Sequence, residues 1–246
     1  MKVENTMTLT RTFCRTALAG WIFLLSFAAS AQTVKPVVAE WNNPAKGRIE
    51  YYNDSLNPLN VVLEAKSFTV SETGEITYRP LDTTLHLKLS TTSFKIMPQQ
   101  SYYVFYEAET EAPPGWFVIY AAFSGFPFRT QQGMNIRLEL PHTVYLLPKG
   151  SLGKSDVVVE KLDFKPAEKK LLVEVYNSGS TFGRVQETVV HFGNKKQEAP
   201  GFPIFPHKKR ILEVALEESG VPTSVTLQFQ DFKVEEKVQQ ATPAAQ

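Results

Sequence analysis

The feature that most constrains this 246-residue chain is a hydrophobic pattern that repeats at every second residue. Such alternation is typical of a β-strand with one buried face, and no segment has the spacing of an amphipathic helix. The apolar positions fall into these sets: Leu59, Val61, Leu63 and Ala65; Leu85, Leu87 and Leu89; Tyr102, Val104 and Tyr106; Trp116, Val118, Tyr120 and Ala122; Ile136, Leu138 and Leu140. Residues 71–75 contain a glycine and predict a hairpin turn. Short strands separated by turns predict an all-β fold built as an antiparallel sandwich.

The alternating pattern restarts after Gly150, which predicts a second sandwich. Further strands are expected at residues 157–159, 171–175, 185–192, 211–216 and 225–229. The segment 48–55 resembles 172–179, because both end a strand with Tyr-Asn and a turn residue. We therefore expect two tandem domains, at residues 32–149 and 150–237, joined by a short linker near 148–154. The tail at 238–246 is rich in Gln, Ala and Pro, a composition that favours disorder.

Residues 1–31 have the three parts of a cleavable secretory signal peptide. Arg11 and Arg15 precede an apolar run at 17–29, and Ala29-Ser30-Ala31 is a small-x-small cleavage site before Gln32. The run is short for a membrane span, and no later segment approaches ~18 apolar residues. We expect export of a mature chain without a membrane span; the alternative is a retained N-terminal anchor.

The only cysteine, Cys14, lies within this signal and precedes its apolar run, so it cannot be a lipidated residue of the mature chain. An exported chain without disulfides must be stabilised by sufficiently large hydrophobic cores. Loss of residues 1–31 leaves 23 basic and 24 acidic side chains. This near balance argues against nucleic acid or an anionic membrane as a partner.

Residues suited to catalysis or metal binding are scattered. The four histidines (His86, His142, His191 and His207) form no metal-binding pair by spacing. His86 is expected in solvent, and His142 and His207, each beside a proline, are expected in loops or at strand ends. No nucleophile elbow or phosphate-binding glycine loop occurs. The sequence therefore predicts a binding protein that is not an enzyme and has no metal or cofactor.

Residues 134–149 combine an alternating strand with a break at Pro148-Lys149-Gly150. Ile136, Leu138 and Leu140 alternate with polar residues or proline. An apolar row of this kind can serve another protein if its strand has a free edge. The alternative is an ordinary strand whose row fills the core of its own domain, and the pattern alone leaves both readings open.

The order of these segments resembles the periplasmic chaperones of the chaperone–usher pilus pathway. The resemblance covers about residues 33–232 and rests on several segments taken together. These are Tyr52-Asn53-Asp54, Phe94-Lys-Ile-Met-Pro98, the strand 116–123, the row Ile136, Leu138 and Leu140, and Val144-Tyr-Leu-Leu-Pro-Lys149. It implies two immunoglobulin-like domains set at an angle. It also implies an ATP-independent periplasmic chaperone that lends its alternating strand to incomplete pilus subunits. The implied partners are pilus-type or other secreted subunits and an outer-membrane usher.

One departure concerns the pair of basic residues with which this family anchors the C-terminal carboxylate of a subunit. Val37 and Tyr145 stand at the two expected positions, and neither is basic. Lys35 and Lys149 lie nearby and are the candidate substitutes, with Tyr145 as a further candidate contact. This departure keeps open a second function, a secreted two-domain structural or adhesive surface module without chaperone activity. A hydrolase on a sandwich scaffold is a third and weaker alternative.

Overall fold

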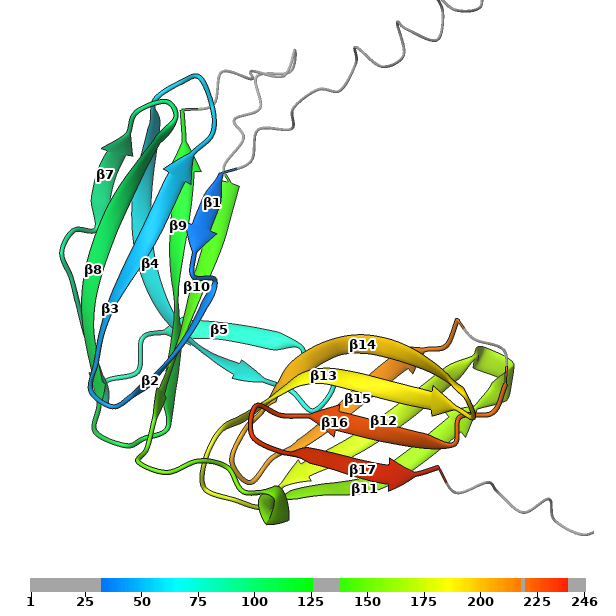
Figure 1. The fold of residues 1–246 in the computed structure, drawn as a ribbon. Coiled ribbons are helices and arrows are strands. Elements are labelled where there is room, and N and C mark those ends of the chain that lie inside the picture. Colours follow the sequence, from blue (N-terminus) through cyan, green and yellow to red (C-terminus); the bar gives the residue numbers. More distant parts are fainter. Residues whose placement is uncertain (1–31, 126–137, 218–219, 239–246) are drawn as a thin grey trace, which may run out of the picture.

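The computed structural model describes residues 32–125, 138–217 and 220–238, and the expected all-β fold is confirmed. Figure 1 shows two β-sandwiches set at an angle, with one hairpin of the first sandwich reaching over to the second. The predicted signal peptide at 1–31 lies outside the described residues, and so does the tail from 239 onward. No helix in the described part of the chain is long and apolar enough to cross a membrane.

The first domain consists of two facing sheets with the strand orders β1-β3-β8-β6 and β2-β10-β9-β4-β5, and β7 also pairs with β4. All strand pairs are antiparallel except the parallel pair of β2 and β10. The strands are β1 (Thr33–Lys35), β2 (Val38–Asn42), β3 (Ala45–Asn53), β4 (Leu59–Val70), β5 (Ile76–Pro80), β6 (Leu85–Leu89), β7 (Ser93–Ile96), β8 (Gln100–Thr110), β9 (Gly115–Ser124) and β10 (Leu138–Leu147).

The second domain pairs a three-stranded sheet, β11-β12-β15, with a four-stranded sheet, β14-β13-β16-β17. Its elements are η1 (Lys154–Asp156), β11 (Val157–Lys165), η2 (Pro166–Glu168), β12 (Lys170–Asn177), β13 (Gly183–Phe192), β14 (Lys195–Ile204), β15 (Lys209–Ala215), β16 (Ser224–Gln228) and β17 (Lys233–Lys237). The alternating pattern did not identify β14 or β17, whose residues are mostly exposed or only partly buried. Val238 is buried in this domain and donates its N–H to Thr223 O at 3.0 Å, so ordered chain includes the first residue of the predicted tail.

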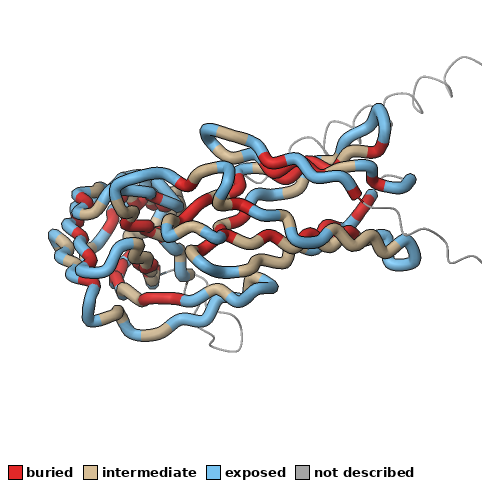
Figure 2. The backbone as a smooth tube through the Cα atoms, turned by 90° about the horizontal axis from the view of Figure 1, so that it is seen from below, coloured by how far each residue is buried: buried red, intermediate tan, exposed pale blue. Residues whose placement is uncertain are grey.

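Each domain has its own hydrophobic core. In the first domain the core includes Ile49, Leu59 and Phe123, and in the second it includes Leu171, Val190 and Leu227. Figure 2 shows the buried segments along the inside of both sandwiches and the exposed ones at loops and outer faces. Because each core is continuous within its own pair of sheets, neither domain needs a disulfide to complete it.

The two similar segments of the sequence each end a strand with a buried asparagine. The side-chain amide of Asn53 donates to Asn57 O at 2.8 Å, and its Oδ1 accepts the N–H of Ser55 at 3.0 Å. In the second domain, the amide of Asn177 donates to Thr181 O at 2.9 Å, and its Oδ1 accepts the N–H of Gly179 at 2.9 Å. Both asparagines are fully buried and tie a turn to the end of a core strand, which is the physical basis of the resemblance.

Candidate functional site: the β10 edge and the interdomain cleft

The strand β10 changes its surroundings halfway along its length. Residues 138–146 pair with β9, and only 143–147 also pair with β2 on the opposite edge. Figure 1 shows β10 at the side of the first sandwich, with β2 alongside its lower part. Among the residues that the structure describes, no strand pairs with the second edge of 138–142. Backbone N–H and C=O groups on such an edge are a template for an added strand.

The predicted apolar row lies on this half of β10. Leu138 and Leu140 are partly buried and pack against the core of the first domain, while Glu139 and Pro141 between them are exposed. The third predicted member, Ile136, lies outside the described residues. The same row continues into Val144 and Leu146, which are both 0% exposed. The row thus runs from the centre of the core to its rim, where its side chains are only partly covered.

A buried histidine, His142, lies directly before the residue at which β10 begins to pair with β2. His142 Nδ1 donates to Pro36 O at 2.6 Å, and the next residue, Thr143, donates its N–H to Val37 O at 2.8 Å. These two bonds attach to β10 the segment that crosses from β1 in one sheet to β2 in the other. The prediction that His142 lies in a loop or at a strand end is wrong, because the strand continues through the preceding proline and buries the ring completely. The exposed position predicted for His86 and the loop position predicted for His207 are confirmed.

The ring of His142 belongs to a chain of hydrogen bonds that crosses between the two sheets. Its Nε2 accepts from Tyr106 Oη at 3.4 Å, and Tyr106 Oη accepts from Trp41 Nε1 at 2.8 Å. Because Nε2 can accept a hydrogen bond only when it carries no proton, this arrangement requires neutral imidazole with its proton on Nδ1. Burial lowers the pKa of His142, and the hydrogen bond to the Pro36 carbonyl opposes that effect.

The residues at the two expected anchor positions have different environments. Val37 is 56% exposed, whereas Tyr145 is 4% exposed and lies between the two domains. Burial raises the pKa of Tyr145, and the nearby Arg184 opposes that rise. The tyrosine is therefore neutral and can offer only a hydroxyl group to a carboxylate.

The two candidate lysines are both exposed and are not brought together. Lys35 lies on β1 opposite Glu50, in the other sheet. Lys149 follows the far end of the β2–β10 pairing, which begins at Thr143 and ends at Leu147. The paired stretch alone spans roughly 13 Å at about 3.3 Å per residue. Lys35 and Lys149 therefore lie beyond opposite ends of this paired stretch.

Aromatic side chains from both domains fill the cleft. The Tyr145 ring stacks on Phe182 with ring centroids 4.3 Å apart, and Trp116 lies 4.6 Å from Phe205. Phe68 adds an edge-on contact to Tyr145 at 6.4 Å. This packing covers the outer face of the strand at 116–120, whose other face lies in the core of the first domain. A charged side chain at the position of Tyr145 would be buried among these rings, which would be unfavourable.

Polar contacts connect the domains around this cluster. Arg184 Nε of the second domain donates to Glu40 Oε1 of the first at 2.6 Å, and its guanidinium lies 5.2 Å from the centre of the Tyr145 ring. At the tip of the β4–β5 hairpin, Glu72 O accepts from Ile211 N at 2.7 Å and from Arg210 Nη1 at 2.7 Å. Sequence reasoning missed both arginines, because their partners lie 144 and 138 residues away in the chain.

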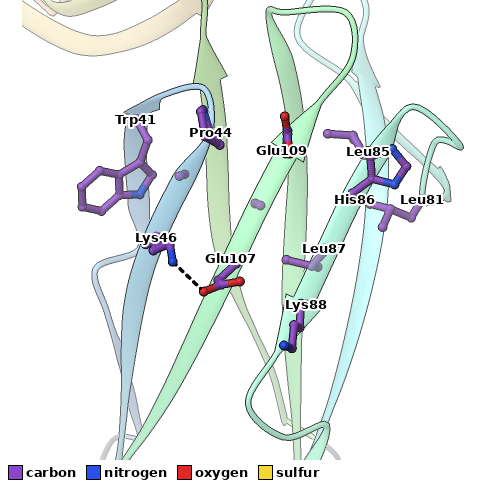
Figure 3. Close-up of a pocket in the computed structure, with 12 residues that line it drawn as sticks. Trp41, Pro44, Lys46, Leu81, Leu85, His86, Leu87, Lys88, Glu107 and Glu109 are labelled. Carbon is purple, nitrogen blue, oxygen red and sulfur yellow. Dashed lines mark hydrogen bonds and ion pairs between the residues drawn. The ribbon is translucent and has the colours of Figure 1, made fainter.

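Another hollow lies along β3, β8 and β6 of the first domain (Figure 3). Its volume is about 970 Å³, and it is wide open to solvent. Lys46 and Glu107 form an ion pair at 2.9 Å within it, and Lys88 lies beside them. The described residues contain no cluster of three or more His, Cys, Asp or Glu side chains suited to a metal ion. These features do not assemble a catalytic constellation of nucleophile, base and orienting group.

No protein-family model matches the sequence, and no curated protein shows a significant match to it. Solved structures do match. The YadV chaperone is 12% identical, with 84% of this chain and 99% of that chain covered and a TM-score of 0.56. The structure of the Salmonella enterica SafA pilin in complex with the SafB chaperone matches at 9% identity. The match covers 87% of this chain and 99% of that chain, with a TM-score of 0.55. A third match is the CsuC–CsuE chaperone–tip adhesion subunit pre-assembly complex from archaic chaperone–usher Csu pili of Acinetobacter baumannii. It is 11% identical, with 85% of this chain and 100% of that chain covered and a TM-score of 0.52.

At such low sequence identity, these structural matches show a shared fold but not a shared activity. The match extends over nearly the full length of the solved chains and therefore includes both domains. The resemblance read from the order of the sequence segments is confirmed at this level: the chain has the two-domain immunoglobulin-like fold of the pilus chaperones.

Proposed function

We propose that this protein is a periplasmic, ATP-independent chaperone that caps incomplete pilus-type subunits by lending them the first half of β10. The observation that carries the proposal is the edge of residues 138–142 with which no described strand pairs, combined with the partly covered row of Leu138 and Leu140. The backbone groups of this edge would pair with a strand of the subunit, and the apolar row would enter its core. Ile136 would extend the row by one position.

The expected energies suit a reversible holding function. Full burial of an aliphatic side chain contributes ~1.5–3 kcal/mol, so three such residues contribute several kcal/mol before ordering costs. Leu138 and Leu140 are partly covered already, and their gain is correspondingly smaller. Backbone pairing would add to this energy and would not require a particular client sequence. The proposal includes no chemical step and no cofactor, and an outer-membrane usher would be a second partner.

The test uses two matched aspartate variants of the mature protein. Leu138→Asp places a charge in the proposed row, while Val62→Asp changes an exposed valine on β4 of the same sheet. Affinity capture from periplasm should recover incomplete-sandwich subunits with the natural protein and with Val62→Asp, and none with folded Leu138→Asp. If Leu138→Asp unfolds, the row is internal to the domain. If the folded variant still captures subunits, the strand is not donated.

The alternative function, a surface module without chaperone activity, is favoured by one observation. Neither Val37 nor Tyr145 supplies a positive charge for a subunit carboxylate, and the Tyr145 position is sealed by rings. A surface module would capture no subunit lacking a strand and would instead be found on the cell exterior. Fractionation of cells followed by detection of the mature chain separates the two functions.

We also propose the domain limits at 32–149 and 150–237, with a linker at 148–154. The last strand of the first domain ends at Leu147 and the first strand of the second begins at Val157, which supports a boundary in this interval. Limited proteolysis of the mature protein should cut first at 148–154 or within residues 125–133. A first cut within 156–230 would contradict the proposed boundary.

A further inference from the structure

The connection between the two sheets of the first domain is fastened to β10 at His142. Residues 36–39, which we call the crossover segment, lead from β1 into β2, an edge strand of the other sheet. Two of its carbonyls bind β10: Pro36 O accepts from His142 Nδ1 at 2.6 Å, and Val37 O accepts from Thr143 N at 2.8 Å. The crossover segment therefore begins to cover β10 directly after the stretch whose second edge pairs with no described strand.

The crossover segment is held more weakly than the chain that follows it. Of its side chains only that of Ala39 is buried, and the others are exposed. Beyond it, Glu40 Oε1 accepts from Arg184 Nε at 2.6 Å, and the side chain of Asn43 exchanges two hydrogen bonds of 2.9 Å with the backbone of Thr110. A segment with few buried apolar contacts opens at a lower free energy than the rest of its domain. We therefore expect the crossover segment to open locally before the remainder of β2 detaches.

The ring of His142 is surrounded by groups that cannot neutralise a positive charge. Tyr106 on β8 and the carbonyl of Pro36 are its hydrogen-bond partners, and Ile119 is its neighbour on β9. By strand alternation, Glu139 on β10 lies on the opposite face of its strand. The charged residues on the strands packed against the ring have contacts elsewhere: Lys46 with Glu107, Arg48 with Tyr103, Glu40 with Arg184, and Lys35 opposite Glu50.

Protonation of His142 would disrupt the hydrogen bonds that cross the core. A proton on Nε2 removes the acceptor that the Tyr106 hydroxyl uses. The Tyr106 oxygen already accepts from Trp41 Nε1 at 2.8 Å, so its own proton would be left without a partner. The cation would also be buried without a counter-charge, which is costly. Because the crossover segment covers the Nδ1 side of the ring, its opening admits water, and a hydrated ring binds a proton more readily. Acid therefore favours the open state.

We propose that the crossover segment is an acid-sensitive switch that opens when His142 takes up a proton. In the closed state at neutral pH, its last two residues pair with Thr143 and Val144. In the open state these two positions of β10 lose their partners on that edge. The edge with which no described strand pairs then lengthens from 138–142 to 138–144, and a longer edge can pair with a longer added strand. The opening itself does not depend on a client, and only the use of the longer edge rests on the proposed function.

Amide hydrogen exchange of the mature protein, measured by NMR between about pH 7 and pH 5, tests the opening directly. The protection factor of Thr143 N–H should fall about tenfold over this range, because a hydrated imidazole titrates near its ordinary pKa of about 6.5. Two amides of the same domain are controls: Asn43 N–H donates to Leu147 O at 3.0 Å beyond the far end of β2, and Leu63 N–H donates to Thr92 O at 2.8 Å. Both should retain their protection. Constant protection of Thr143, or an equal loss at either control, would overturn the proposal.

Ring nitrogen shifts and two glutamine variants assign the switch to His142. The ring should be neutral at pH 7 with its proton on Nδ1, and its protonation should coincide with the loss of protection at Thr143. Folded His142→Gln should show no acid-dependent loss, whereas His86→Gln, which changes an exposed histidine on β6, should behave like the natural protein. An undiminished loss in folded His142→Gln would contradict the switch, and so would a ring that stays neutral while Thr143 opens. If His142→Gln does not fold, the coincidence of the two titrations in the natural protein decides.

Affinity capture from periplasm at about pH 7 and pH 5.5 separates the switch from strand donation. If both hold, the natural protein should recover more subunit at the lower pH, and folded His142→Gln should show no such gain. Opening at Thr143 without capture at either pH would contradict strand donation and leave the switch supported.

Discussion

In β10, residues 143–146 are paired along both edges, whereas among the described residues 138–142 are paired along one edge only. The same alternating row passes through both halves, and its exposure changes where β2 begins. Val144 and Leu146 are completely buried, while Leu138 and Leu140 are only partly covered. A row of apolar residues can therefore serve the domain core at one end and remain available to another protein at the other. The difference arises from the neighbouring strand and not from the composition of the row.

The prediction with the largest expected effect compares truncation of one leucine in each half of β10. Leu146→Ala should destabilise the first domain by about 2–5 kcal/mol, because it leaves a cavity in a closed core. Leu138→Ala should cost clearly less, about 1 kcal/mol, since its side chain lies at the rim, where solvent can fill the space. Denaturant unfolding followed by tryptophan fluorescence measures both values. Equal losses at the two positions would show that the row has no functional boundary.

The second effect concerns His142, which lies at the boundary between the two halves. The folded-state pKa of His142 is lowered by burial, so the unfolded chain takes up a proton first as the pH falls. The stability of the first domain should therefore be complete above about pH 6.5 and should decrease below it, by at most about 1.4 kcal/mol per pH unit. Denaturant unfolding between pH 7.5 and 5 measures this slope.

Two glutamine variants separate His142 from the other groups that titrate in this range. His142→Gln should be less stable than the natural protein at neutral pH, and its free energy of unfolding should decrease less as the pH falls below about 6.5. The control His86→Gln removes an exposed histidine that contacts Glu111 and should retain the natural slope. A natural slope in His142→Gln would assign the acid sensitivity to other groups.

The smallest expected effect concerns the two exposed lysines at opposite ends of the paired stretch. Lys35→Ala and Lys149→Ala, made singly and together, should each weaken capture of a subunit with a free C-terminus by no more than a few-fold, because exposed charges are screened by solvent. The same variants should matter less for a subunit whose C-terminus is amidated. Titration of both subunits by fluorescence anisotropy distinguishes these cases. Identical losses for the two subunits would exclude a role for the lysines as carboxylate anchors.

The sequence predicted the features that depend on local periodicity. The alternating strands follow from side-chain spacing, and the turn at 71–75 and the break after residue 147 follow from glycine and proline within the same segments. Burial of His142 was not predictable in this way, because it depends on Pro36 and Tyr106, which are distant in the chain. The polar contacts of Arg184 and Arg210 cross between domains and likewise leave no local pattern. The donor row remains a prediction, since Ile136 lies outside the described residues and no client is present.

The β4–β5 hairpin has a mechanical consequence for the angle between the two sandwiches. Rigid bodies joined by one flexible tether can swivel freely, whereas a second joint leaves only the axis that passes through both. The tether here is the segment after Leu147, and the second joint is the carbonyl of Glu72 held by Ile211 and Arg210. Turning about the remaining axis would require the stacked rings of Tyr145 and Phe182 to slide apart. The hairpin therefore acts as a strut, and a load applied to β10 would be carried by both domains together.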